Sequence, residues 1–143
     1  MIESILLWHK RARPEPDHEQ FNVQLGCHIE EMAELLQEIS CNTVQGSLDA
    51  AVDYLIIVAN ALKCGASSAN VVDRHNFLKE LCDGVVTAAG VAHTGGYALE
   101  SAMQEVNRSN WSKFDENGLP VFNKHGKITK GSRYSAADLN GMF

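Results

Sequence analysis

Helical periodicity is the feature that most limits what this chain can fold into. Between about Asp17 and Ser40, apolar residues recur three or four positions apart, which places them on one face of a long helix. These residues are Leu25, Ile29, Met32, Leu36 and Ile39. The segments 2–12, 48–63, about 71–93 and about 97–108 also show helical patterns, and no strand pattern alternates with them. The sequence therefore predicts an all-α protein, a four- to five-helix bundle.

The segment 48–63 is apolar almost all round, so we expect a helix that is well buried. Ser47 is a plausible N-cap for it. Asp49 would then lie in the first turn, where an acid complements the helix dipole. Asp53 sits inside the apolar run and must find a polar partner there.

The tail differs from the rest of the chain. Asn117-Gly118 and His125-Gly126 are turn signals, and they favour a small hairpin or an extended arm over a helix. We therefore expect a single domain over residues 1–143, with a helical bundle at about 1–110 and a C-terminal arm at about 111–143.

Composition and charge exclude several classes of protein. The chain has 143 residues and a formal net charge of −6, and it shows no basic patch upstream of the tail, so we expect no nucleic acid polymer as partner. Its four cysteines form no CxxC pair, which argues against a zinc knuckle. The longest apolar run contains Asp53 and Asn60 and is shorter than the roughly 20 residues that span a bilayer. We expect a cytoplasmic protein without a membrane partner.

Acidic residues gather on the faces opposite two of the apolar stripes. Glu31, Glu34 and Glu38 lie opposite the stripe of the helix at 17–40. On the helix at 71–93, the apolar stripe is formed by Leu78, Leu81, Cys82, Val85, Ala89 and Ala92. The residues opposite that stripe are Glu80, Asp83, Thr87 and Gly90. Each acidic face could be nothing more than a solvated surface. However, Gly90 costs about 1 kcal/mol inside a helix, which makes sense if something approaches the backbone there.

The spacing of these acids also suits a metal ion. Residues at i and i+3 are neighbours on a helix, so Glu31 pairs with Glu34 and Glu80 pairs with Asp83. If the two helices face each other, four carboxylates converge, and each two like charges repel by roughly 3 kcal/mol at an effective dielectric constant of about 20. Such a cluster persists only with cations in it. Ligands that are all oxygen suit Mg²⁺ or Mn²⁺ rather than zinc.

The order of these residues resembles a known family. Asp83, then Gly90 in "GVA", then Gly96, then "EVNRSNWSKF" at 105–114, is similar to the MazG-like branch of the all-α nucleoside triphosphate pyrophosphohydrolases, which also include the phosphoribosyl-ATP pyrophosphatases. The segment "GKITKGSRYSAADL" at 126–139 resembles the tail of that branch, so the resemblance runs from Gln24 to Leu139. It implies hydrolysis of a nucleoside triphosphate to the monophosphate and pyrophosphate. It also implies a homo-oligomer, a dimer or a tetramer.

The resemblance implies roles for particular residues. Mg²⁺ would be held by Glu31, Glu34, Glu80 and Asp83, and the catalytic group would comprise Glu31, Glu34 and Glu38. Glu38 would orient water, although it could also be an ordinary solvated glutamate. The nucleotide would be bound by Gln24, Asn107, Asn110 and Lys113. Helix capping is the alternative role for the two asparagines. Glu30 is expected to be structural or a helper, and the tryptophans Trp8 and Trp111 are expected to pack rather than to stack on a base.

The chain departs from the family in the long segment 35–79 between the two acid pairs. That segment carries a rival pair, Asp49 and Asp53, spaced i and i+4. We favour Glu80 and Asp83 because they stand in register with Gly90, Gly96 and Asn107. Two other functions stay open: a protein that senses a nucleotide without cleaving it, and an all-α interaction module whose acidic faces are only solvated.

Overall fold

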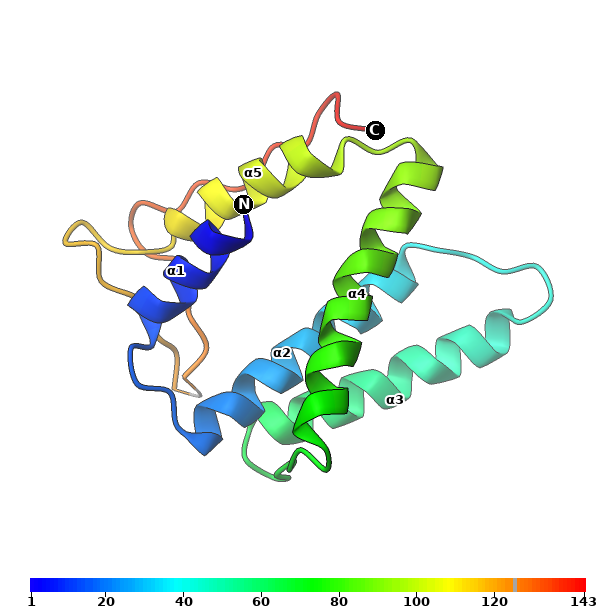
Figure 1. Cartoon of the computed structure of the whole chain (residues 1–143), viewed down its shortest axis with the longest axis horizontal. Coiled ribbons are helices and arrows are strands. Elements are labelled where there is room, and N and C mark those ends of the chain that lie inside the picture. Colours follow the sequence, from blue (N-terminus) through cyan, green and yellow to red (C-terminus); the bar gives the residue numbers. More distant parts are fainter. Residues whose placement is uncertain (125) are drawn as a thin grey trace. The chain divides into compact units, whose positions relative to one another are not determined.

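The computed structural model describes residues 1–124 and 126–143, and the regular elements of these residues are helices (Figure 1). The described residues form α1 (Ile2–Ala12), α2 (His18–Gln37), α3 (Gln45–Lys63), α4 (Arg74–Gly95) and α5 (Leu99–Trp111). The prediction of an all-α fold is therefore confirmed. None of the helices in the described residues is both long enough and apolar enough to cross a membrane.

The chain divides into two compact units, and each is described by itself. The first unit contains Met1–Pro14, Asn70–Val121 and Ile128–Phe143, and the second contains Glu15–Ala69 and Phe122–Lys127. The expected single domain over 1–143 stays a prediction. His125, which formed part of a predicted turn, lies outside the described residues.

In the second unit, α2 and α3 lie side by side and run in opposite directions (Figure 1). The start of α2 is fixed by a capping box. The backbone N–H of Gln20 donates to Asp17 Oδ1 at 2.8 Å, and the backbone N–H of Asp17 donates to Gln20 Oε1 at 3.3 Å. Because two backbone donors at the helix start are satisfied in this way, α2 begins directly after Asp17.

Small residues, rather than the predicted stripe, make the close contact between α2 and α3. A Cβ atom added at Gly26 would lie 2.8 Å from the carbonyl oxygen of Ala59. The buried residues of α2 are Asn22, Val23, Gly26 and Ala33. The predicted stripe is therefore wrong in part, because Met32 and Ile39 are 47% and 50% exposed. Glycine lets the two backbones come close, whereas Met32 and Ile39 are left exposed to solvent.

The prediction that the third helix is well buried is wrong. Its buried residues are Val52, Ala59 and Leu62, whereas Tyr54 is 70% and Ile57 62% exposed. Within its unit, α3 has one helical neighbour, and one helix covers only one face of another.

The start of α3 also differs from the prediction. The helix begins at Gln45 after Val44, so Ser47 is not its N-cap. Asp49 consequently lies beyond the first turn and does not have the position near the helix start that we expected. Its Oδ1 instead accepts a hydrogen bond of 2.7 Å from Gln45 Nε2. Asp49 therefore has a local structural role.

The core of the first unit is aromatic. Trp8, Ala12 and Phe114 are buried together, and Trp111 and Ile128 pack against them. The Trp8 ring stacks on Phe114 with 5.9 Å between centroids, and Trp8 Nε1 donates to the carbonyl of Asn110 at 2.8 Å. The predicted packing role of the two tryptophans is confirmed, since they join α1 to the end of α5.

The tail of the first unit makes a turn at Asn117-Gly118, where the sequence predicts one. The backbone N–H of Asp115 donates to the carbonyl of Leu119 at 2.9 Å, and Gly118 between them has a φ of 71°. That left-handed conformation favours glycine. Further on, the N–H of Thr129 donates to the carbonyl of Val121 at 2.7 Å, which makes the chain double back as a small hairpin.

We predict opposite effects of alanine at two helical glycines. Gly26→Ala should lower the free energy of unfolding by about 1–3 kcal/mol, because the new methyl group meets backbone atoms of α3. Gly84→Ala in α4 has open space around its Cβ position, so it should raise the free energy of unfolding by about 0.5–1 kcal/mol through helix propensity alone. Urea unfolding of both variants tests this, and a Gly26→Ala variant as stable as wild type would show that α2 and α3 do not meet as closely as described.

Candidate functional site

The acids of α2 lie on a solvent-exposed surface. Glu31 and Glu34 are both exposed on this helix, and so is Gln24 about two turns earlier. Glu38 is the first residue after the helix and is exposed too. These carboxylates are thus accessible to an ion from solvent. Such exposure is needed for metal binding, and it is also what an ordinary solvated surface shows.

The acid pair of α4 already shares one positive charge. Lys79 Nζ donates to Asp83 Oδ2 at 2.6 Å and to Glu80 Oε1 at 3.1 Å. The hydrogen bond to Asp83, and then the one to Glu80, raise the pKa of Lys79. Our sequence analysis missed Lys79, although a lysine four residues before an acid is a recognisable helical ion pair. One ammonium group thus bonds both carboxylates of the pair at once.

The face around this pair leaves room for a ligand. A Cβ atom at Gly90 would have no neighbour within 4 Å, which agrees with our expectation of open space there. The hydroxyl of Thr87 donates to the backbone carbonyl of Asp83 at 2.9 Å, so that group is already used within the helix.

Carboxylate oxygens are the donors that each pair offers, and such donors fit Mg²⁺ or Mn²⁺. Each pair supplies two carboxylates, one pair from each unit. Within the described ranges 1–124 and 126–143, no group of three or more His, Cys, Asp or Glu side chains is arranged to hold a metal ion.

Of the predicted nucleotide-binding residues, Gln24 lies on α2 in the second unit, whereas Asn107, Asn110 and Lys113 lie in the first unit, in the second half of α5 and just after it. Asn107 Nδ2 donates to Ser4 Oγ at 2.8 Å and so joins α5 to α1. The backbone carbonyl of Asn110 accepts the hydrogen bond from Trp8. The backbone carbonyl of Lys113 accepts a hydrogen bond of 3.1 Å from the N–H of Gly131. All three residues are half-buried, and the C-cap of α5 is Ser112 rather than an asparagine.

A carboxylate–guanidinium pair holds the tail against this part of α5. Arg108 donates to both oxygens of Glu105, at 2.8 and 2.7 Å, and to the carbonyl of Ala136. The backbone N–H of Asp138 donates to Glu105 Oε1 at 3.0 Å. The hydrogen bonds from Arg108, followed by the one from Asp138, lower the pKa of Glu105 to about 2. The acid and the arginine of "EVNR" therefore have a structural role in positioning the tail.

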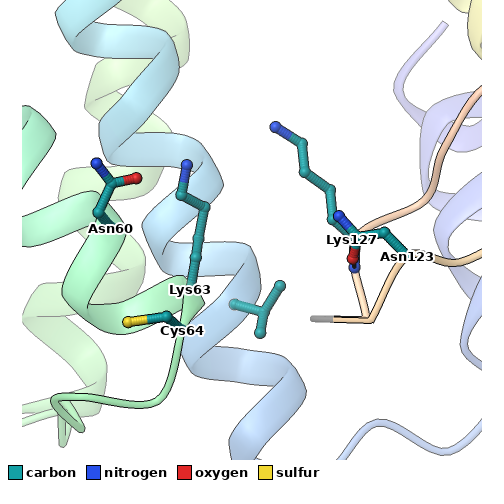
Figure 2. A pocket seen from close by; sticks show the side chains of 6 residues that line it. Asn60, Lys63, Cys64, Asn123 and Lys127 are labelled. Carbon is teal, nitrogen blue, oxygen red and sulfur yellow. Dashed lines mark hydrogen bonds between the residues drawn. The ribbon is translucent and has the colours of Figure 1, made fainter.

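The second unit contains a cavity that the sequence analysis did not foresee. Its volume is about 310 Å³. It is lined by Val23, Asn60, Lys63, Cys64, Asn123 and Lys127. Figure 2 shows Lys63 with its α3 neighbours on one side of this space and Lys127 with Asn123 on the other.

The two lysines are held by a single carboxylate. Lys63 Nζ donates to Glu30 Oε1, and Lys127 Nζ donates to Glu30 Oε2 at 2.8 Å. Burial raises the pKa of Glu30, but the two hydrogen bonds from the lysines outweigh burial and leave the pKa below its ordinary value. Glu30 thus has the structural role that we expected for it. The cluster itself was missed, because its members lie 33 and 97 positions from Glu30 and no local pattern links them.

Comparison with known proteins finds no matching family model, no matching curated protein and no matching solved structure.

We predict that Glu30→Gln destabilises the protein in a pH-dependent way. Glu30 is ionised in the folded protein with a lowered pKa, so its contribution is present above the unfolded-state pKa of about 4.3 and is lost as the pH falls through the lower folded-state value. At pH 7 the variant should lose about 1–2 kcal/mol of unfolding free energy, because two ammonium groups lose a charged partner.

The loss should shrink as the pH falls through the lowered folded-state pKa of Glu30, because the wild-type carboxyl is then protonated. Urea unfolding across this pH range measures it. Glu34→Gln, an exposed acid on the same helix, serves as control and should stay within about 0.5 kcal/mol of wild type. An effect of Glu30→Gln that is independent of pH would contradict the ion-pair account.

Proposed function

We propose that this protein is a Mg²⁺-dependent nucleoside triphosphate pyrophosphohydrolase, which cleaves a ribonucleoside or deoxyribonucleoside triphosphate to the monophosphate and pyrophosphate; Mn²⁺ could replace Mg²⁺. The proposal combines the resemblance to the MazG-like family with the accessible acid pairs on α2 and α4. It includes a cytoplasmic location, supported by four cysteines that are free in the described part of the chain.

The observation that carries the proposal is the shared bond of Lys79. Glu80 and Asp83 direct one oxygen each to the same ammonium group, at 3.1 and 2.6 Å. Two carboxylates that converge on one cation are arranged as a pair of metal ligands would be. The ion pairs are exposed, with about half of each charged side chain or more open to solvent, so Lys79 can be displaced at little cost.

Each side chain has its own role in the proposed reaction. The metal ligands are the pair Glu31 and Glu34 on α2 and the pair Glu80 and Asp83 on α4, and Glu38 orients the attacking water. When bound, Mg²⁺ neutralises phosphate oxygens and makes its own water more acidic. Lys113 places a positive charge on a phosphate, and Asn110 and Gln24 offer amide groups to the sugar or base. Asn107 donates one amide N–H to Ser4 Oγ, and its second amide N–H can bond the nucleotide.

A homo-oligomer, either dimer or tetramer, is part of the proposal. Leu78, Val85 and Val86 on α4 are 62%, 57% and 68% exposed, and Tyr54 and Ile57 on α3 are exposed as well. Apolar surface of this extent is typical of interfaces between protein chains.

We predict that Asp83→Asn abolishes metal-dependent turnover, whereas Asp49→Asn leaves most of it. Asparagine is nearly isosteric with aspartate but supplies no negative charge for the metal. Asp49 bonds Gln45 within α3 and needs no metal to explain it. The measurement is pyrophosphate release from a panel of nucleoside triphosphates with Mg²⁺ or Mn²⁺, and circular dichroism confirms folding. The reverse phenotypes would move the site to α3, and release of orthophosphate alone would refute the reaction.

We predict that Lys79→Met lowers the Mg²⁺ concentration needed for half-maximal rate by about two- to fivefold. The acid pair no longer has to release an exposed ammonium group before it binds the metal. Titration of turnover with Mg²⁺ at saturating substrate measures this. An increased metal requirement would mean that Lys79 helps to hold the metal or the substrate.

A further inference from the structure

We propose that the cavity beside Glu30 binds a small oxyanion of the phosphate class, such as pyrophosphate or the phosphate group of a nucleoside monophosphate. The inference concerns the cavity of the second unit alone and does not depend on hydrolysis, on a metal ion or on the acid pair of α4. It rests on the lining of the cavity, on the charge balance at Glu30 and on the size of the space.

The charge balance at Glu30 is the first observation. Two ammonium groups share one carboxylate, so this cluster has an excess of one positive charge in a chain whose net charge is −6. The side chain of Lys63 is only 16% exposed, so little water compensates its charge. Glu31 acts on Lys127 electrostatically, but it lies exposed in water, where such an effect is screened.

Unused donors are the second observation. An ammonium group has three N–H donors, and in the described residues Glu30 accepts one bond from each lysine. Glu30 therefore holds both lysines at the cavity, and further N–H donors of each ammonium group remain for a ligand. Asn60 adds a carboxamide group to the lining, and Asn123 lines the opposite side, where its Oδ1 accepts a hydrogen bond of 3.0 Å from the backbone N–H of Lys127 (Figure 2).

The size of the cavity limits the ligand. At about 310 Å³ it is at the lower end of small-molecule sites, which suits a phosphate or diphosphate better than a whole nucleotide. Lysines supply the charge, and a lysine is a common binder of phosphate, on which it acts as a point charge.

Calorimetric titration of the full chain with sodium pyrophosphate tests the proposal, in EDTA so that no metal takes part. A parallel titration with a nucleoside monophosphate separates the free anion from an esterified phosphate. We expect binding of at least one of them. Lys63→Met and Lys127→Met should each raise its Kd about tenfold or more, since each removes a charge-assisted hydrogen bond.

Lys124→Met is the matched control. Lys124 is exposed, lies three positions from Lys127 and does not line the cavity, so its variant should bind within about twofold of wild type. If circular dichroism shows that Lys63→Met does not fold, Lys127→Met alone tests the proposal. The Lys127 side chain is 45% exposed, so its replacement should leave the fold intact.

Two results would overturn the proposal. One is the absence of binding to wild type up to on the order of 10 mM of either ligand. The other is an equal loss in all three lysine variants or in none, which would leave only unspecific attraction between charges.

Discussion

The close contact between α2 and α3 at Gly26 determines much of the second unit. A Cβ atom there would lie 2.8 Å from the carbonyl oxygen of Ala59 and 2.8 Å from Lys63 Cγ. Because no side chain separates the two helices at this level, the stem of Lys63 crosses α2 and its ammonium group reaches Glu30, one turn further along. Glu31 and Glu34 are exposed on the same helix. One glycine therefore permits the close approach at which Lys63 bonds Glu30.

The two units carry clusters of opposite charge balance. In the first unit Lys79 is shared by two carboxylates, and in the second Glu30 is shared by two lysines. An excess of negative charge favours a cation, and an excess of positive charge favours an anion. The pair on α4 is exposed and can exchange its lysine for another cation, whereas Lys63 and Glu30 are mostly buried and form a more permanent arrangement. This difference is why we assign a metal to the first cluster and an oxyanion to the second.

Sequence reasoning went furthest where the information is local. Helical periodicity predicted all five helices, and the start and end of α1 agree with the prediction. Periodicity also predicted an apolar stripe on α2 but could not tell that Gly26 and Ala33, rather than Met32 and Ile39, are buried, because close approach depends on the partner helix. The exposure of α3 was missed for the same reason, since an apolar helix does not reveal how many neighbours it has.

In the candidate sites, too, the contacts between residues close in sequence could be predicted, and those between distant residues could not. The acid pairs follow from i and i+3 spacing, and the bond of Lys79 to Asp83 could have been predicted from i and i+4 spacing. The cluster at Glu30 could not, because Lys63 and Lys127 come from distant parts of the chain. The resemblance to MazG-like pyrophosphohydrolases predicts a function for the acids and gives none to this cluster.

Direct measurement of metal binding tests the central claim, which is that the acid pairs on α2 and α4 are ligands for divalent cations. Electron paramagnetic resonance can follow free Mn²⁺ during titration of the protein without any nucleotide. The account predicts saturable binding to wild type, which is weakened by Glu31→Gln and by Glu80→Gln but not by Glu30→Gln. Wild-type protein that binds no more Mn²⁺ than Glu31→Gln and Glu80→Gln do would contradict it, and the acidic faces would then be solvated surfaces only.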